Sequence, residues 1–505
     1  MSVSSSLSSS SGSNAAGTLY DVAVVGYGPT GATLANLLAL RGLRVLVLER
    51  DADIYRLPRA IAFDGEVMRV FQTVGIAEQL EPKTVVAPGM RFLNAKGDIL
   101  IDWRRPLEVG PHAWHASYRF HQPELEELLR SRLARYTNVD VRLRHDLFAL
   151  DPDSDGVTLR FEDTSSGRLL RARARYVVGC DGARSLVRRL LGTELEDMKS
   201  HERWLVVDVI LKRDRPDLGD HAIQYCDPAR PATYVRGAGA RRRWELMLLP
   251  HENSLEMSRT EKIWELLSRW VTPDDAVLER PAVYTFHSVV ARGWRNGRLL
   301  IAGDAAHQTP PFMGQGMCAG IRDASNLAWK LAEVIGGHAP ESLLDTYESE
   351  RSPHVREFIE TAVRLGSVIQ TLDPEVARKR DIEMAANPTM MTTPQPALGP
   401  GAHAGTPPAG TISMQPVDAD GRRFDEIAGY EFSLLAMPEL ADAVRQLANG
   451  RYAVHVAADA RTCDWMKAQG IRAALIRPDR YIAACANSTE EVAKFRDPAY
   501  VAFAH

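Results

Sequence analysis

The chain of 505 residues has no excess of positive charge. Lysine and arginine number 61 against 65 aspartates and glutamates, which gives a net charge of −4 at pH 7. Proteins that bind nucleic acid or an anionic membrane surface mainly through charge carry a basic excess. We therefore expect neither a nucleic acid nor a membrane among the partners of this protein.

Cysteine is scarce, and none of the five forms a CxxC pair: Cys180, Cys226, Cys318, Cys463 and Cys485. An odd number of isolated cysteines is a poor disulfide framework and offers no spacing typical of a zinc site. His112 and His115 lie three residues apart without a carboxylate or cysteine partner in register. We expect no metal site and a reducing, cytoplasmic location.

Long hydrophobic runs are also missing. The most apolar stretch, residues 32–48, is interrupted by Arg41 and Arg44, so no segment predicts a membrane-spanning helix. Residues 1–18 are rich in serine and lack both the basic and the apolar region of a secretory signal. We expect them to form a disordered tail.

What the chain does contain is a set of short apolar runs typical of a buried parallel sheet. They lie at 22–25, 44–49, 175–179 and 298–302, and a polar loop and helical sequence follow each of them. This pattern predicts an α/β fold with a Rossmann-like sheet. We assign it to a discontinuous domain formed by residues 19–200 and 291–385.

Three further segments differ from these in composition and hydrophobic pattern. Residues 201–290 alternate apolar and polar side chains, which predicts an inserted antiparallel sheet that binds the substrate. Residues 386–412 are rich in proline, glycine and threonine and are typical of a linker. Residues 413–505 contain two expected strands, 452–456 and 473–478, and a helix at 437–449, which indicates a small C-terminal α/β domain.

A glycine-rich turn follows the first expected strand and opens a helix at about residues 30–40. In Gly26-Tyr27-Gly28-Pro29-Thr30-Gly31 the first glycine allows a tight turn, the second lets a pyrophosphate approach, and the third lets helix and strand pack closely. Glu49 ends the next strand, where a carboxylate accepts hydrogen bonds from a ribose hydroxyl. The turn predicts a site for a dinucleotide, either NAD or FAD.

Two later strands end in similar turns. Cys180-Asp181-Gly182 closes the third strand, and Ser185 is placed to cap a basic helix. The fourth strand ends in Gly303-Asp304, where the glycine keeps the backbone close and the carboxylate reaches sugar-like hydroxyls. No second complete dinucleotide motif is present, since the stretch at 237–242 lacks the third glycine. We expect His307, near the last of these turns, to make a structural hydrogen bond.

Together these stretches resemble the three fingerprints of the flavin-dependent aromatic hydroxylases, which are single-component FAD monooxygenases. The likeness rests on GYGPTG with Glu49, on CDGARSLVRR, and on RLLIAGDAAHQTPPFMGQGMCAGIRDASNLAWKL, and it spans about residues 20–365. Within the family, Arg59-Ala60-Ile61 and the CDPARP stretch at 226–231 are similar to the hydroxylases of 3-(3-hydroxyphenyl)propionate. The C-terminal segment resembles the thioredoxin-like appendage of related phenol hydroxylases, but it lacks a CxxC. A packing or dimerisation role is therefore expected for it, with a homodimer as the assembly.

The resemblance implies bound FAD, and NADH or NADPH as a transient co-substrate; we favour NADH. It also implies a set of FAD-binding residues: Gly26, Gly28, Pro29, Thr30, Gly31, Glu49, Arg50, Arg59, Gln122, Asp181, Gly303, Asp304, Pro311, Gly314, Gly316 and Met317. Among these, Gln122 and Asp181 would lie along the phosphates and the ribityl chain. The helix that starts near Gly316 would direct its positive end at the reduced flavin.

The implied reaction is hydroxylation of a phenolic acid of the 3-(3-hydroxyphenyl)propionate or 3-hydroxycinnamate type, with O2, through a flavin C4a-hydroperoxide. A base that draws the phenol toward phenolate would raise the nucleophilicity of the ring. The candidates in the inserted sheet are Tyr225, Tyr284 and His287. Arg241-Arg242-Arg243 fits a solvated turn better than a clasp for a substrate carboxylate.

Two alternatives remain open at this stage. The same chemistry fits another phenol, a polyketide, an indole or an antibiotic as the substrate. A binding protein on the same fold, without turnover, is the alternative from another functional class.

Overall fold

The computed structural model describes residues 19–56, 59–386 and 388–496. The predicted tail, residues 1–18, lies outside the described residues. The first sheet has a parallel core of five strands, β18 (Leu299–Ile301), β11 (Arg168–Gly179), β1 (Leu19–Val25), β2 (Val45–Glu49) and β8 (Val139–Leu143), in that order. Four of these strands lie at the predicted apolar runs, which confirms the Rossmann-like sheet. Strand β17 (Arg295–Asn296) pairs with β18 at one edge. Strand β10 (Val157–Asp163) pairs with the long strand β11, and β9 (His145–Pro152) pairs with β10.

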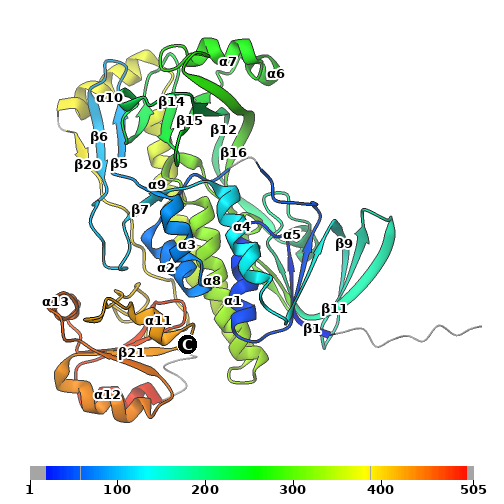
Figure 1. Cartoon of the computed structure of the whole chain (residues 1–505), viewed down its shortest axis with the longest axis vertical. Coiled ribbons are helices and arrows are strands. Elements are labelled where there is room, and N and C mark those ends of the chain that lie inside the picture. The colour runs from blue at the N-terminus through cyan, green and yellow to red at the C-terminus, as the bar shows by residue number, and fades with distance from the viewer. Residues whose placement is uncertain (1–18, 57–58, 387, 497–505) are drawn as a thin grey trace, which may run out of the picture.

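Helices cover this sheet because its strands are apolar on both faces. Val22, Val24 and Val47 are fully buried. Helix α1 (Pro29–Leu40) packs against both α4 (Gln122–Leu133) and α8 (Gly316–Ile335), and the three stand side by side (Figure 1). The remaining elements of this part are α2 (Gly65–Val74), α3 (Ala77–Leu80), α5 (Leu186–Leu191) and a small sheet of β3 (Ala62–Asp64), β7 (Ser117–Arg119) and β4 (Val85–Val86).

The second sheet has nine strands and forms the layer above the first domain (Figure 1). Its order is β19 (His307–Gln308), β16 (Ala276–Arg292), β12 (Glu194–Leu211), β15 (Arg241–Met247), β14 (Ala232–Arg236), β13 (Ala222–Tyr225), β5 (Gly89–Leu93), β6 (Ile99–Arg104) and β20 (Thr389–Met390). The sheet therefore extends beyond the predicted insert at 201–290. It also recruits β5 and β6 from the first domain and β20 from the expected linker.

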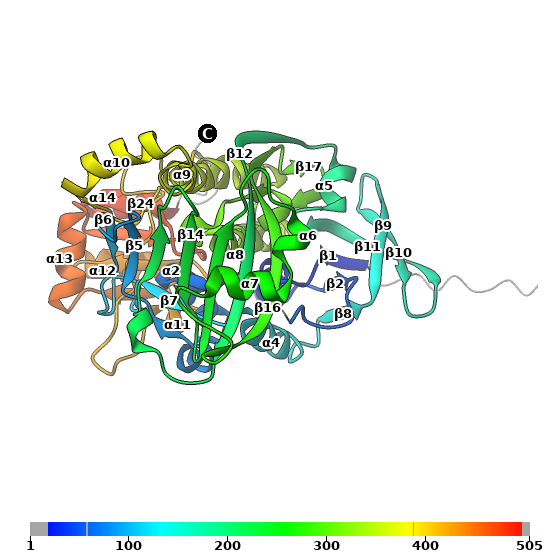
Figure 2. The same ribbon diagram turned by 90° about the horizontal axis from the view of Figure 1, so that it is seen from above.

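Strand alternation gives this sheet two different faces. The outer face, with Leu205 and Trp244, packs under α6 (Ser254–Met257) and α7 (Thr260–Leu267), which lie across it (Figure 2). The inner face, with Trp204 and Met247, packs toward Phe312 and helix α9 (Thr346–Ile369). Helix α10 (Pro374–Ala386) completes this layer. Register thus decides which side chains of the insert face the first domain.

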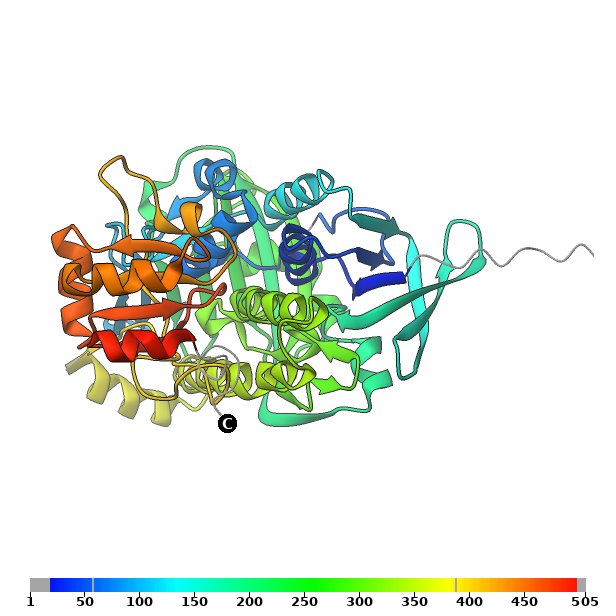
Figure 3. The ribbon, with the colours of Figure 1, turned by 90° about the horizontal axis from the view of Figure 1, so that it is seen from below.

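The C-terminal domain has the predicted thioredoxin-like arrangement. Its four strands run in the order β22 (Ala453–Val456), β21 (Ser433–Ala436), β23 (Ala473–Ile476) and β24 (Ile482–Ala486), and β21 pairs in parallel with β22. The helices are α11 (Phe424–Ala428), α12 (Ala441–Ala448), α13 (Ala460–Ala468) and α14 (Thr489–Ala493). Seen from below, the domain lies beside α8 and α9 (Figure 3). Strands β21 and β24 were not predicted, since their short apolar runs lack a periodic pattern.

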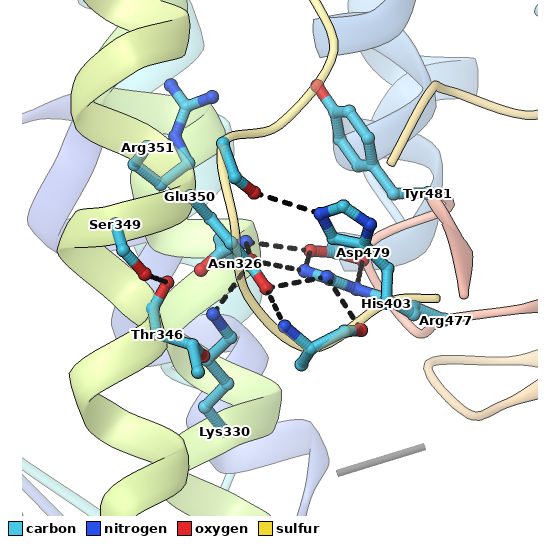
Figure 4. A network of polar contacts seen from close by, with 12 residues as sticks. Asn326, Lys330, Thr346, Ser349, Glu350, Arg351, His403, Arg477, Asp479 and Tyr481 are labelled. Atoms are coloured by element: carbon cyan, nitrogen blue, oxygen red, sulfur yellow. Dashed lines mark hydrogen bonds and ion pairs between the residues drawn. The ribbon is translucent and has the colours of Figure 1, made fainter. Parts of the chain in front are cut away.

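A buried ionic network joins the C-terminal domain to the first domain (Figure 4). Glu350 of α9 accepts hydrogen bonds from the Arg477 guanidinium at 2.8 and 2.9 Å, and from Lys330 Nζ at 2.8 Å. The backbone amide of Ala402, in the expected linker, donates to the same carboxylate. Because these groups are almost fully buried, the segment that precedes the C-terminal domain is anchored rather than a free tether. No helix within the described residues is long and apolar enough to cross a membrane.

Candidate active site

The glycine-rich turn has the geometry that its sequence predicts. Gly26 has a φ of 99°, and a Cβ atom there would clash with the carbonyl group of Cys180. A Cβ atom on Gly31 would clash with the carbonyl oxygen of Gly26, so helix and strand pack as closely as expected. Gly28 borders open space instead. It is the glycine of this turn that leaves room for a ligand to approach the backbone.

Two helices begin at this place without a side-chain cap. Pro29 is the first residue of α1, and neither its N-cap, Gly28, nor the N-cap of α8, Gln315, makes a capping hydrogen bond. The space next to Gly28 and Gly316 is open. Uncapped amide groups at a helix N-terminus form a favourable site for phosphate or another anion.

Thr30 brings the first and third motifs together. A Cβ atom on Gly303 would lie 2.7 Å from the Thr30 hydroxyl, and one on Gly320 would clash with it. The start of α1, the turn at Gly303 and the first turns of α8 therefore meet at a single point. Because Thr30 lies so close, positions 303 and 320 both require glycine.

Asp323 holds the Gly303-Asp304 turn in place. Its carboxylate accepts hydrogen bonds from the Gly303 amide at 3.0 Å and the Arg351 Nε at 2.9 Å, and lies 2.6 Å from the His307 Nε2. Burial alone would raise the pKa of Asp323, but His307 and Arg351 hold it below its usual range. His307 thus makes the predicted structural contact. Asp304 is exposed and makes no side-chain hydrogen bond within the described residues.

Glu49 stands at the end of β2, as predicted, and braces the glycine-rich turn. Its carboxylate accepts hydrogen bonds from the amides of Tyr27 at 2.7 Å and Asp51 at 2.9 Å. Arg50 is exposed. The sequence analysis missed Arg130, which donates to the Tyr27 carbonyl at 3.2 Å and lies over its ring at 4.4 Å. Arg130 adds positive charge beside the open space at Gly28.

A polar strip on α4 connects this turn with the loop around Arg59. The Gln122 side-chain oxygen accepts hydrogen bonds from the amides of Arg59 at 3.0 Å and Ala60 at 2.7 Å. Its amide group donates to Glu126, which lies 3.8 Å from Arg130. The spacing of Gln122, Glu126 and Arg130 by four residues places them on one helix face. That spacing was the available sign of a role for Arg130.

Asp181 serves the second motif as a cap. Its carboxylate accepts hydrogen bonds from the amides of Leu186 at 2.7 Å and Val187 at 3.1 Å, at the start of α5. Ser185 is the N-cap of that helix, as predicted, and accepts from the Arg188 amide. The Arg188 guanidinium then donates to the Ala305 carbonyl at 3.0 Å. Asp181 therefore helps to fix the motifs relative to one another.

The loop before α8 borders a cavity between the small sheet of β3 and β7 and strand β5 of the second sheet. Pro311 opens a short 3-10 turn, and Gly314 follows it with a φ of 67°. Met317 lies half-buried on the first turn of α8. The residues that line the cavity are Ala62, Phe63, Asp64, Gly89, Met90, Arg105, Ser117, Arg119, Met313, Gly314 and Gln315.

The inner face of the second sheet carries a buried ionic cluster. Arg243 donates to Asp208 at 2.7 and 3.0 Å and to the Arg59 carbonyl at 2.7 Å, which ties the sheet to the loop of the first domain. Glu245 lies 3.9 Å from Arg243, and burial raises the pKa of Glu245 to about 7. Arg280 lies 3.8 Å from Asp208. The stretch 241–243 is thus part of strand β15 and largely buried, and the expectation of a solvated turn is wrong.

Strand register separates the three predicted bases. Tyr225 faces the outer layer, where its hydroxyl accepts a hydrogen bond from the Trp270 indole at 3.0 Å, and burial raises its pKa. Tyr284 pairs with Trp204 on the inner face, with the Arg280 guanidinium 5.0 Å from its ring centre. His287 is exposed and its Nδ1 lies 2.8 Å from that of His201. Of the three, Tyr284 alone faces the inner layer, and sequence reasoning missed Glu245.

The described residues hold no group of three histidine, cysteine, aspartate or glutamate side chains arranged to bind a metal ion. His112 is half-buried, and loss of hydration lowers its pKa to about 4.

Comparison with known proteins agrees with this geometry. A family described as FAD binding domain matches residues 19–362. A probable NADH-specific resorcinol 4-hydroxylase of Rhodococcus jostii (strain RHA1) is 39% identical over 502 residues, which cover 94% of this chain and 93% of that protein. A 3-(3-hydroxy-phenyl)propionate/3-hydroxycinnamic acid hydroxylase of Mycobacterium sp. (strain JLS) is 36% identical over 439 residues, 82% of this chain and 75% of that protein. The flavin-dependent monooxygenase PieE, solved with FAD and substrate, has a TM-score of 0.80 at 23% identity over 94% of this chain and 97% of its own, which shows a shared fold.

Proposed function

Because this chain belongs to the flavin-dependent aromatic hydroxylases of the FAD binding domain family, we propose that it hydroxylates a phenol with NADH and O2. The observation that carries the proposal is the meeting of two uncapped helix starts, at Gly28 and Gly316, with the exposed Asp304 turn. The loop that leads into the start of α8 also lines a cavity, which strand β5 of the second sheet borders. A relative named for resorcinol and another named for hydroxyphenylpropionate both act on a hydroxylated ring.

The residues present fit FAD. Gly28 and the start of α1 would take the pyrophosphate, with Arg130 adding charge, because this is where the backbone is open and its amides are uncapped. Glu49 would accept from the ribose of the adenosine half, and Asp304 from the ribityl hydroxyls, through carboxylate lone pairs. The start of α8 would face the pyrimidine side of the flavin, where negative charge resides after reduction. When bound, FAD takes a hydride from NADH and activates O2.

The protein then has three tasks: to bind the phenol, to exclude water and to manage the phenol proton. Met313, which lines the cavity, belongs to the apolar cluster formed by α9 and the inner face of the second sheet, and such apolar packing limits the entry of water on that side. Glu245 on the inner face is our proposed base, since a group with a pKa of about 7 accepts a proton near neutral pH. Arg243 and Arg280 favour its charged form. Tyr284 lies on the same face and would orient the ring or relay the proton.

The test is oxidation of NADH by the FAD-loaded protein, with product analysis. We expect resorcinol or 3-(3-hydroxyphenyl)propionate to stimulate NADH oxidation and to yield a ring with one more hydroxyl group. Stimulation with peroxide but without product means that a larger phenol is the substrate. A protein that cannot retain FAD refutes the proposal and leaves the binding protein without turnover as the alternative.

We further propose that the enzyme works in the cytoplasm and forms a homodimer. All five cysteines lie within the described residues and all are unpaired, which suits a reducing compartment. Sedimentation of the FAD-loaded protein at micromolar concentration tests the dimer; a single species with the mass of one chain refutes it.

A further inference from the structure

Two arginines, Arg119 buried and Arg105 half-buried, line the cavity beside the loop that precedes α8. Arg105 follows β6, and Arg119 ends β7; both contribute to the cavity wall together with Gly314 and Gln315. Arg119 is 7% exposed. Within the described residues neither guanidinium makes a hydrogen bond or an ion pair, and the Arg119 Nε is buried without a partner.

The nearest acid is already engaged elsewhere. Asp64 lies on the cavity wall, but its carboxylate accepts a hydrogen bond from Arg322 at 2.6 Å and from the Val67 amide at 3.0 Å. Arg105 instead lies over the ring of Trp103 at 4.5 Å. The two arginines therefore have no acid of their own.

Placing this pair of charges in the folded protein costs free energy. Burial and the neighbouring Arg105 lower the pKa of Arg119 to about 10, which shows that its charge is poorly compensated. Burial also lowers the pKa of Arg105. Two cations that share one cavity, one buried and one half-buried, repel each other and lose hydration, and a bound anion relieves both penalties.

We propose that Arg105 and Arg119 bind the carboxylate of the substrate, and that the substrate is therefore a phenol with an acidic side chain rather than a neutral phenol. This inference rests on the proposed function. The negative groups of FAD would not need these arginines, because the pyrophosphate would lie at the start of α1 and the reduced flavin ring at the start of α8. The guanidinium forks match the two oxygens of a carboxylate.

The experiment is a ligand titration of the full-length, FAD-loaded protein, followed by the change in flavin absorbance. The probes are 3-(3-hydroxyphenyl)propionate, its methyl ester and resorcinol. We expect the acid to bind about 10- to 100-fold more tightly than its ester, the range for hydrogen bonds to a charged group. Equal affinity of acid and ester, or binding of resorcinol alone, overturns the proposal.

Variants assign the effect to the pair. R119Q and R105Q should each weaken binding of the acid about 10-fold or more, while binding of the ester and the FAD content stay unchanged. The matched control is R104Q, because Arg104 is the exposed neighbour that pairs with Asp102. R119K keeps the positive charge but lacks the two-pronged guanidinium, so it should bind the acid with an intermediate affinity. This variant replaces R119Q in the titration if R119Q does not fold.

The outcomes separate this proposal from the proposed function. If both arginine variants lose FAD and weaken all three ligands equally, the pair serves the flavin, and the substrate assignment is wrong. If the acid binds as expected but no phenol is hydroxylated, the anion site stands and the proposed function fails. If a neutral phenol is hydroxylated and the acid does not bind, the proposed function stands and the anion site fails.

Discussion

Replacing Arg477 by methionine should weaken the attachment of the C-terminal domain to the first domain. Arg477 is fully buried and holds two carboxylates, Glu350 at 2.8 and 2.9 Å and Asp479 at 2.6 and 2.9 Å. Breaking a buried ion pair from one side costs about 3–5 kcal/mol. Lys330 and Asn326 still donate to Glu350, so we expect the lower end, about 3 kcal/mol, for R477M.

The assay is urea unfolding, combined with hydrogen exchange of β23 and β24. Hydrogen exchange reports the local opening of one domain. A single unfolding curve of a multidomain protein does not separate this opening from unfolding of the other domains. The control is Arg445→Met, because Arg445 is an exposed arginine of the same domain; it should change the stability by less than about 0.5 kcal/mol. An R477M variant as stable as this control refutes the reasoning.

A second change tests the mechanism of the loss. Adding E350Q to R477M removes a buried charge that has lost its main partner, so the double variant should be more stable than R477M alone. The pH dependence gives an independent check. Burial would raise the pKa of Glu350, but Arg477 and Lys330 hold it well below its usual range. The stabilisation is therefore present above the ordinary glutamate pKa and declines as the pH falls below it; the gap between wild type and R477M should narrow in acid.

Three further predictions concern the site. Burial raises the pKa of Glu245 from 4.5 to about 7. The free energy of unfolding of the wild type therefore falls by up to about 3 kcal/mol as the pH rises through this range. E245Q should remove that slope in thermal melts between pH 5 and 8 and lower kcat about 100-fold or more; an unchanged slope and kcat contradict this role. Gly31→Ala places a Cβ atom against the Gly26 carbonyl and should abolish FAD retention, measured as the ratio of flavin to protein absorbance. Gly110→Ala should retain FAD, because an added Cβ atom there would make only an ordinary contact, 3.5 Å from the Trp114 carbonyl oxygen. Asp323→Asn removes the ion pairs with His307 and Arg351 and should weaken FAD binding about 10-fold; full flavin content at submicromolar protein would show that the Gly303 turn holds without it.

The parts of the molecule that the sequence predicts well are those set by local pattern. The buried strands, the glycine-rich turn and the Ser185 cap each depend on residues close together in the chain. Tyr225 and Tyr284 show the limit, because both lie in the predicted inserted sheet and only the strand register decides that one faces outward and the other inward. Arg105 and Arg119 belong to no motif and meet only through the fold. Asp181 stays a predicted FAD-binding residue; its second contact, the cap on the helix of its own motif, was not predicted.

The make-up of the second sheet bears on how this enzyme can be engineered. Specificity is often altered by exchanging the substrate-binding segment between relatives, and residues 201–290 look like a natural cassette. However, β13 pairs in parallel with β5, β20 pairs with β6, and β19 pairs with β16, so the sheet draws on four separate stretches of chain. Arg105 and Arg119, which line the cavity, also lie outside residues 201–290. A chimera made by a single exchange would combine the sheet of one parent with the carboxylate pocket of the other.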